Sequence, residues 1–145
     1  MIFKQTNRTS PEQVFIVCRN VSAATVSAGI PVEWDVTVAT DGNAVTAAKS
    51  ASPAGLFAGI TDASMTDSAY GLVQVYGFRT SAYISAASAG NAPGTFVQAL
   101  AGILTDVTMS AATTSGATFV SLMETVGAAA GNSATLQYNV FIRAL

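Results

Sequence analysis

Alternation of apolar and polar residues is the clearest pattern along this chain. Between positions 32 and 38 every even residue is apolar and every odd residue is polar, and positions 136–143 alternate in the same way except at Phe141. Successive side chains of a strand point to opposite faces, so both segments are predicted to be half-buried β-strands. Phe141 is expected to project from the otherwise polar face.

Several other segments are rich in Val, Ile, Thr, Phe and Tyr, the residue types that favour strands. They are residues 14–18, 56–60, 72–76, 82–85, 95–100, 103–109 and 118–123. The segment 14–18 is apolar on both faces, which indicates a central strand or one covered by a partner. The Ala-rich segments 44–51 and 127–131 are each expected to form no more than a helical turn.

Turn chemistry separates these segments. Asp41-Gly42-Asn43 suits a tight hairpin, and Gly- and Pro-containing breakers recur along the rest of the chain. The predicted fold class is therefore all-β, a small β-barrel or β-sandwich with short loops and an extended N-terminal arm. Residues 1–13, which are polar with little to bury, are assigned to the arm, and residues 14–145 to a single β domain.

Composition adds a preference for association. Apolar residues make up 50% of the 145 residues, charged residues make up 10%, and the net charge is −2. Soluble domains average about 25% charged residues, and a surface poor in charge favours contact with other proteins. The six cations are scattered rather than clustered, which argues against nucleic acid as a partner.

Membrane insertion and secretion are not expected either. The longest uncharged run, residues 80–105, is rich in Ser, Ala, Gly, Asn and Pro, which is unlike a transmembrane helix. The N-terminal residues 1–13 lack the apolar stretch of a secretory signal. The chain is therefore expected to be soluble and made in the cytoplasm, with no membrane partner.

Candidate chemistry is sparse. The chain has no His and a single cysteine, Cys18, so a Cys-His dyad, a Cys-His zinc site and an intrachain disulfide are ruled out. Glu33 and Asp35 share one strand face and are expected to be solvated, opposite a core-facing Trp34. No phosphate-binding glycine loop occurs. We expect no enzymatic activity, no catalytic residues, no metal and no cofactor.

One block goes beyond composition. It consists of Ala54-Gly55-Leu56-Phe57-Ala58-Gly59-Ile60-Thr61, followed by Ala69-Tyr70-Gly71-Leu72-Val73-Gln74-Val75-Tyr76-Gly77. This block resembles the head decoration, or cement, proteins of tailed bacteriophages, and so does the upstream hairpin-like segment 26–35. The similarity covers residues 26–93, about half of the chain. Gly59, Gly71 and Gly77 are interpreted as structural turn glycines that allow tight bends or close backbone approach.

The resemblance implies a role and partners. Such proteins sit on the outer surface of the virion head, commonly as homotrimers, and clamp neighbouring capsid subunits. By implication the partners are the major capsid protein and other copies of this chain, after assembly in the host cytoplasm. Candidate capsid contacts lie on the arm, at Lys4, Gln5, Asn7 and Arg8. Candidate oligomer-interface residues are Phe15, Val17 and Phe141.

Two alternatives remain open. One is another virion structural protein, such as a tail-tube or head-fibre protein, which would have a similar composition. The other is a carbohydrate-binding β-sandwich that would use Trp34 and the tyrosines as a ligand platform.

Overall fold

The structure is a computed structural model that describes residues 12–37, 42–47, 56–85, 92–94, 96–100, 103–106, 120–124 and 135–144. The regular elements in these ranges are all strands, so the all-β prediction is confirmed. They are β1 (Gln13–Asn20), β2 (Pro31–Trp34), β3 (Ala44–Ala47), β4 (Phe57–Thr61), β5 (Tyr70–Ser85), β6 (Phe96–Leu100), β7 (Ile103–Asp106), β8 (Val120–Leu122) and β9 (Thr135–Arg143).

Five strands close into a barrel, which we call the first barrel. Around it the order is β1-β3-β2-β4-β5, and β5 returns to pair with β1. All of these pairings are antiparallel except that of β1 with β3, which is parallel. Closure gives each of the five strands a paired neighbour on both sides, although β3 pairs with β1 only at Arg19 and Asn20.

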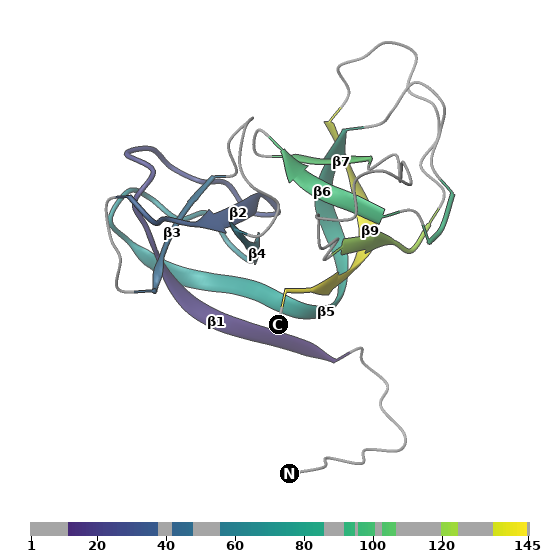
Figure 1. The fold of residues 1–145 in the computed structure, drawn as a ribbon, viewed down its shortest axis with the longest axis horizontal. Helices are drawn as coiled ribbons and strands as arrows, with labels where there is room; N and C mark the ends of the chain where they lie inside the picture. Colours follow the sequence, from purple (N-terminus) through teal and green to yellow (C-terminus); the bar gives the residue numbers. More distant parts are fainter. Residues whose placement is uncertain are drawn as a thin grey trace.

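A second closed set of pairings uses the other half of β5. There β5 pairs with β7, β7 with β6, β6 with β8, β8 with β9, and β9 returns to β5. We call this set the second circuit. Figure 1 shows β5 as one long ribbon that runs beneath β2, β3 and β4 and then turns upward among β6, β7 and β9. The 16-residue β5 is therefore the element shared by both halves of the fold.

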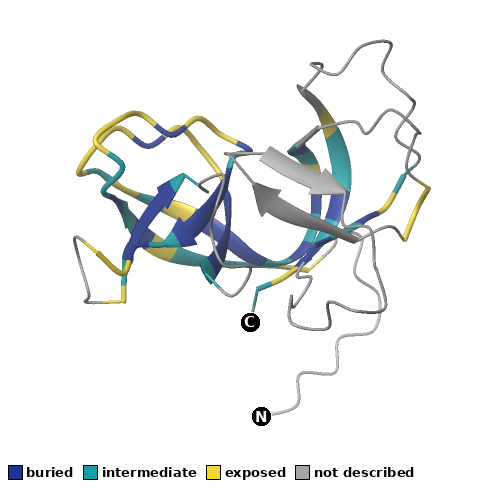
Figure 2. Cartoon of the chain, turned by 45° about the horizontal axis from the view of Figure 1, so that its top comes forward, coloured by how far each residue is buried: buried dark blue, intermediate teal, exposed yellow. Residues whose placement is uncertain are grey.

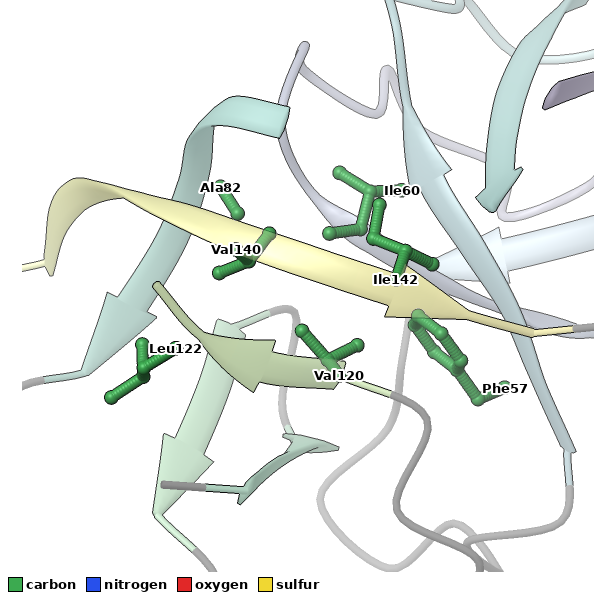
Figure 3. Close-up of a cluster of buried hydrophobic side chains, with 7 residues drawn as sticks. All are labelled: Phe57, Ile60, Ala82, Val120, Leu122, Val140 and Ile142. Atoms are coloured by element: carbon green, nitrogen blue, oxygen red, sulfur yellow. The ribbon is translucent and has the colours of Figure 1, made fainter. Parts of the chain in front are cut away.

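Two clusters of buried apolar side chains stabilise these halves. The first core contains Cys18, Val26, Val32, Val45, Ala58, Met65 and Val73, inside the first barrel. The second core contains Phe57, Ile60, Ala82, Val120, Leu122, Val140 and Ile142, and Figure 3 shows these side chains gathered between β4, β5, β8 and β9. Figure 2 shows buried residues along the strands and exposed residues on the connections at the outer end of the first barrel.

β4 contributes to both cores because of a bulge. Gly59 pairs with Val32 and Phe57 with Glu33, so the register shifts by one residue at Ala58. As a result, Ala58 points into the first core, whereas Phe57 and Ile60 belong to the second core. An extra residue in one strand interrupts the alternation in this way.

Several sequence-based assignments change. The segment predicted as a strand from 32 to 38 is a strand only to Trp34. Ala44–Ala47, expected to be part of a helical turn, forms β3 and pairs with both β2 and β1; its alternate residues Val45 and Ala47 pack in or against the first core, as expected for a strand. The separate strands predicted at 72–76 and 82–85 are parts of β5. β1 begins at Gln13, so that residue belongs to the barrel rather than to the arm.

Candidate interaction surface

The outward side of the β1–β5 pair carries exposed apolar side chains. Val17 lies directly opposite Leu72, and the next outward pair along the two strands is Arg19 with Tyr70. Val17 is 61% exposed, Leu72 45% and Tyr70 64%. Phe15, two residues before Val17, is half-buried. We call these five residues the outer β1–β5 face.

Strand alternation explains why β1 carries apolar residues both toward the first core and on the outer β1–β5 face. Ile16, Cys18 and Val73, which alternate with the outward residues, pack in or against the first core. The sequence segment 14–18 therefore supplies the barrel interior with one set of apolar residues and leaves the other set outside. β1 has a paired neighbour on each edge, β5 and β3, as the first of the two interpretations of this segment expects, yet Val17 is exposed on its outward side. Cover by a partner, the second interpretation, stays a prediction.

The same side of β5 changes from exposed to buried within two residues. Leu72 is 45% exposed, but Gln74 is fully buried. Gln74 pairs with Phe15 of β1 and with Ile60 of β4, so β1 and β4 lie on opposite edges of β5. At this point the second core begins, and the outer β1–β5 face ends.

Charged groups flank the outer face on opposite edges. Arg19 lies on the β1 edge, opposite Tyr70. Asp62 follows β4 on the other edge, where its backbone nitrogen donates a 2.9 Å hydrogen bond to the carbonyl of Leu72. The Asp62 side chain is 47% exposed.

A buried arginine lies between the two halves of the fold. The guanidinium of Arg79 donates hydrogen bonds to the carbonyl of Thr61 (2.8 Å), the carbonyl of Ser81 (3.2 Å) and Oε1 of Gln74 (3.3 Å). Its Nη1 lies 3.5 Å from Oδ1 of Asp62. Burial lowers the pKa of Arg79 from its ordinary value, and the Asp62 carboxylate acts in the opposite direction. The guanidinium nevertheless remains charged at physiological pH.

An aromatic group lies where β5 meets β9. The rings of Tyr76 and Phe141 are in a T-shaped arrangement with centroids 5.4 Å apart, and the Arg143 guanidinium carbon lies 5.6 Å from the centroid of Phe141. Both rings are half-buried and Arg143 is exposed. Phe141 therefore projects from the side of β9 opposite Val140 and Ile142, and its ring is already packed against its own chain.

The three glycines singled out from the sequence lie inside strands rather than in turns. Gly59 and Gly77 have φ angles of +147° and +102°, and a Cβ at either would run into a backbone carbonyl, that of Gln74 or Glu12 respectively. A Cβ at Gly71 would lie 2.6 Å from Cγ of Met65. Close approach of neighbouring elements, the second part of the sequence interpretation, accounts for all three positions.

The carboxylates of Glu33, on β2, and Asp35, directly after β2, are not solvated as the sequence pattern predicts. Glu33 and Asp35 are buried, with exposed fractions of 4% and 8%, whereas Trp34 is half-buried against the first core. Oδ1 of Asp35 accepts hydrogen bonds from the backbone nitrogen of Thr37 (2.9 Å) and from its hydroxyl (3.3 Å). The expectation of a solvated carboxylate face is therefore wrong: β2 is a central strand, with β3 on one edge and β4 on the other, and the side that carries Glu33 is buried as well as the side that faces the first core.

Three further features predicted from the sequence are the single cysteine, the lack of a metal site and the contacts of the arm. Cys18 is fully buried, and burial raises the pKa of its thiol to about 11. Among the described residues, no three Cys, Asp or Glu side chains are grouped closely enough to hold a metal ion. The proposed arm contacts Lys4, Gln5, Asn7 and Arg8 lie outside the described residues.

The sequence located only some of the residues on the outer β1–β5 face. Phe15 and Val17 were identified from the two-sided apolar pattern of β1, but Leu72 and Tyr70 were not. Their exposure depends on which strand pairs with β1, and this long-range pairing leaves no local signal in the sequence.

Comparison with known proteins does not extend these observations. No protein-family description matches the chain, and no curated protein shows significant sequence similarity to it. Within the described ranges, no helix has the length and apolar character needed to cross a bilayer.

Proposed function

We propose that this protein is a structural component of a tailed-bacteriophage particle that binds the outside of the head, associates with copies of itself and stabilises the capsid. The observation that carries the proposal is the outer β1–β5 face, where Val17, Leu72 and Tyr70 are exposed on a closed barrel. Exposed apolar residues grouped on one surface are typical of protein–protein contact sites.

Three further features support this role. The block of residues 54–77 resembles the head decoration proteins, and within it Gly59, Gly71 and Gly77 allow β4 and β5 to pack closely against their neighbours. Only 10% of the residues are charged, which favours association over free diffusion. Two closed sets of strands share β5, so the two halves of the fold are joined through a continuous strand, an arrangement suited to bridging neighbouring subunits.

A capsid is a regular lattice, so a protein that binds it can make the same weak contact at many places. An oligomer that touches several capsid subunits at once gains avidity, so each contact need not be tight. The homotrimer implied by the resemblance would provide such multivalency, and its candidate arm contacts are Lys4, Gln5, Asn7 and Arg8.

Two measurements test the proposal. Mass spectrometry of purified virions should detect the chain at a fixed ratio to the major capsid protein. The purified protein should co-sediment with undecorated expanded heads and raise the temperature at which they release DNA. Absence from virions, together with failure to bind heads, would reject the role in favour of another particle component or a glycan-binding module, which a glycan array would reveal.

The arm is tested separately. Deleting residues 1–10 should leave the far-UV circular dichroism spectrum unchanged but weaken co-sedimentation with heads. A full-length variant with Lys4, Gln5, Asn7 and Arg8 all changed to Ala is the matched control for length. If both variants bind heads as tightly as the unchanged protein, the capsid contact lies on the β domain.

A further inference from the structure

We propose that the outer β1–β5 face is the surface through which copies of this chain contact one another, with Arg19 of one copy directed toward Asp62 of its neighbour. The inference rests on the proposed function only in assuming that copies associate on the particle. It adds the location of the contact, its apolar centre and its charge pattern.

The apolar centre consists of paired residues rather than isolated ones. Val17 and Leu72 are direct cross-strand neighbours, and Tyr70 is the next outward residue of β5. The other large exposed apolar residues among those described are Val36 and Met123, which follow β2 and β8. Burial of adjacent apolar side chains removes a continuous area from water, whereas scattered ones contribute little to association.

The exposed residues of this face offer side chains to a partner. β5 pairs with β1 on one edge and with β4 on the other, so the backbone groups of β5 beneath the face are already used in the ladder. Contact with Val17, Leu72 and Tyr70 therefore takes place through their exposed side chains.

The charges favour a second copy as the occupant. Arg19 lies on the β1 edge of the face, and Asp62 lies on the β4 edge, with Leu72 and Tyr70 of β5 between the two edges. When two copies meet face to face across a two-fold axis that runs along β1 and β5, the β1 edge of one copy lies against the β4 edge of the other. The face is thus complementary to itself, because a cation on one edge meets an anion on the other.

Asp62 is able to serve such a contact. Its side chain is 47% exposed although Oδ1 lies 3.5 Å from the buried Arg79. A carboxylate has two oxygens and accepts several hydrogen bonds, so an arginine from a neighbouring copy can approach from the exposed side. Arg19 is half-buried and follows the exposed Val17 by two residues on the same side of β1.

Matched lysine substitutions test the location. Val17→Lys and Leu72→Lys should each raise the dissociation constant for self-association about 30-fold or more, as expected when a central interface residue is lost. Val36→Lys and Met123→Lys are the controls, because Val36 (58% exposed) matches Val17 (61%) and Met123 (48%) matches Leu72 (45%). Sedimentation velocity gives the mass, and thermal melts should show that all four variants fold.

Site-directed cross-linking gives an independent measure. Val17→Cys with a short bifunctional maleimide should yield covalent dimers at protein concentrations where Val36→Cys yields none. The native Cys18 is fully buried and should not interfere. Arg19→Glu should weaken association as well, because it places like charges beside Asp62 of the neighbour.

The outcomes separate the inference from the proposed function. The inference is overturned if the unchanged protein is monomeric at all concentrations, or if Val17→Lys and Leu72→Lys associate as well as the two controls. If association depends on this face but virions lack the protein, the proposed function fails and the inference stands. If virions contain the protein and both lysine variants still form oligomers, the function stands and the inference fails.

Discussion

Arg79 donates a 2.8 Å hydrogen bond from Nη2 to the backbone carbonyl of Thr61, the last residue of β4. The same carbonyl accepts a 2.9 Å hydrogen bond from the nitrogen of Gly29, and the carbonyl of Gly29 accepts one of 3.2 Å from Tyr83. Arg79 therefore connects the second half of β5 to the loop that precedes β2. This relationship fixes how the first barrel meets the second circuit.

Replacing Arg79 should destabilise the protein far more than replacing its acidic neighbour. Arg79→Met removes three hydrogen bonds from a charged donor and leaves Oε1 of the buried Gln74 without that donor, although the Thr61 carbonyl keeps its bond from Gly29. We therefore expect a loss of about 3 to 5 kcal/mol in the free energy of unfolding. Asp62→Asn should cost no more than about 1 kcal/mol, because the Asp62 side chain is half-exposed. Urea denaturation of the variants measures both values. Equal losses would mean that the ion pair, rather than the buried hydrogen bonds, stabilises the junction.

Gly77 should tolerate alanine less well than Gly42, although both have a positive φ. A Cβ at Gly77 (φ +102°) would meet the carbonyl of Glu12, whereas a Cβ at Gly42 (φ +76°) would have nothing within 4 Å. Gly77→Ala should therefore cost more than about 3 kcal/mol, because strain and overlap add together. Gly42→Ala should cost about 1 to 2 kcal/mol from strain alone. Thermal melts of the two variants test this order, and a smaller loss at Gly77 would contradict the close approach of β1.

Fold class was predictable from local pattern, whereas the way the strands join was not. Alternation at 136–143 located β9, and the apolar run at 14–18 located β1, because burial on one or both faces leaves a direct mark on the sequence. The continuity of β5 was missed since Thr80 and Ser81 interrupt the apolar pattern. These residues lie where the register with β9 shifts between Arg79 and Ala82.

The outer β1–β5 face was predictable only where a residue's own strand shows the pattern. Val17 was found because its own strand is apolar on both sides. Leu72 and Tyr70 share their block with residues of the first core, so nothing local distinguishes an outward Leu72 from an inward Val73. The burial of Glu33 was missed because alternation alone predicts one solvated face. That rule fails for a strand that is buried on both faces, as β2 is at Val32 and Glu33.

Replacing Asp35 should lower the free energy of unfolding, because its carboxylate is buried rather than solvated. Its carboxylate is buried and accepts two hydrogen bonds from Thr37. Asp35→Ala leaves the backbone nitrogen of Thr37 without this acceptor, so we expect a loss of about 1 to 3 kcal/mol. The exposed Asp67, whose Oδ1 accepts a 3.1 Å hydrogen bond from Ala23, is the control, and Asp67→Ala should cost no more than about 1 kcal/mol. Chemical denaturation that gives the reverse order would restore the solvated-face prediction.

Stability at alkaline pH should depend on Cys18. Burial raises the pKa of its thiol to about 11 in the folded protein, whereas an unfolded cysteine titrates at about 8.5. Between these values the unfolded chain loses a proton that the folded chain keeps, so deprotonation favours unfolding. The stabilising effect is complete below the unfolded pKa and is lost as the pH rises through the folded pKa.

The comparison with an alanine variant isolates this effect from the titration of tyrosines and lysines. The loss for the unchanged protein between pH 8 and 11 should exceed that for Cys18→Ala by up to roughly 3 kcal/mol, the equivalent of the pKa difference. Urea melts at closely spaced pH values measure both curves. In the same range a thiol reagent should modify Cys18 only at the rate of unfolding, since the side chain is fully buried. Parallel pH curves for the two proteins, together with rapid modification of the native thiol, would mean that Cys18 is accessible to water and that the first core is open at this position.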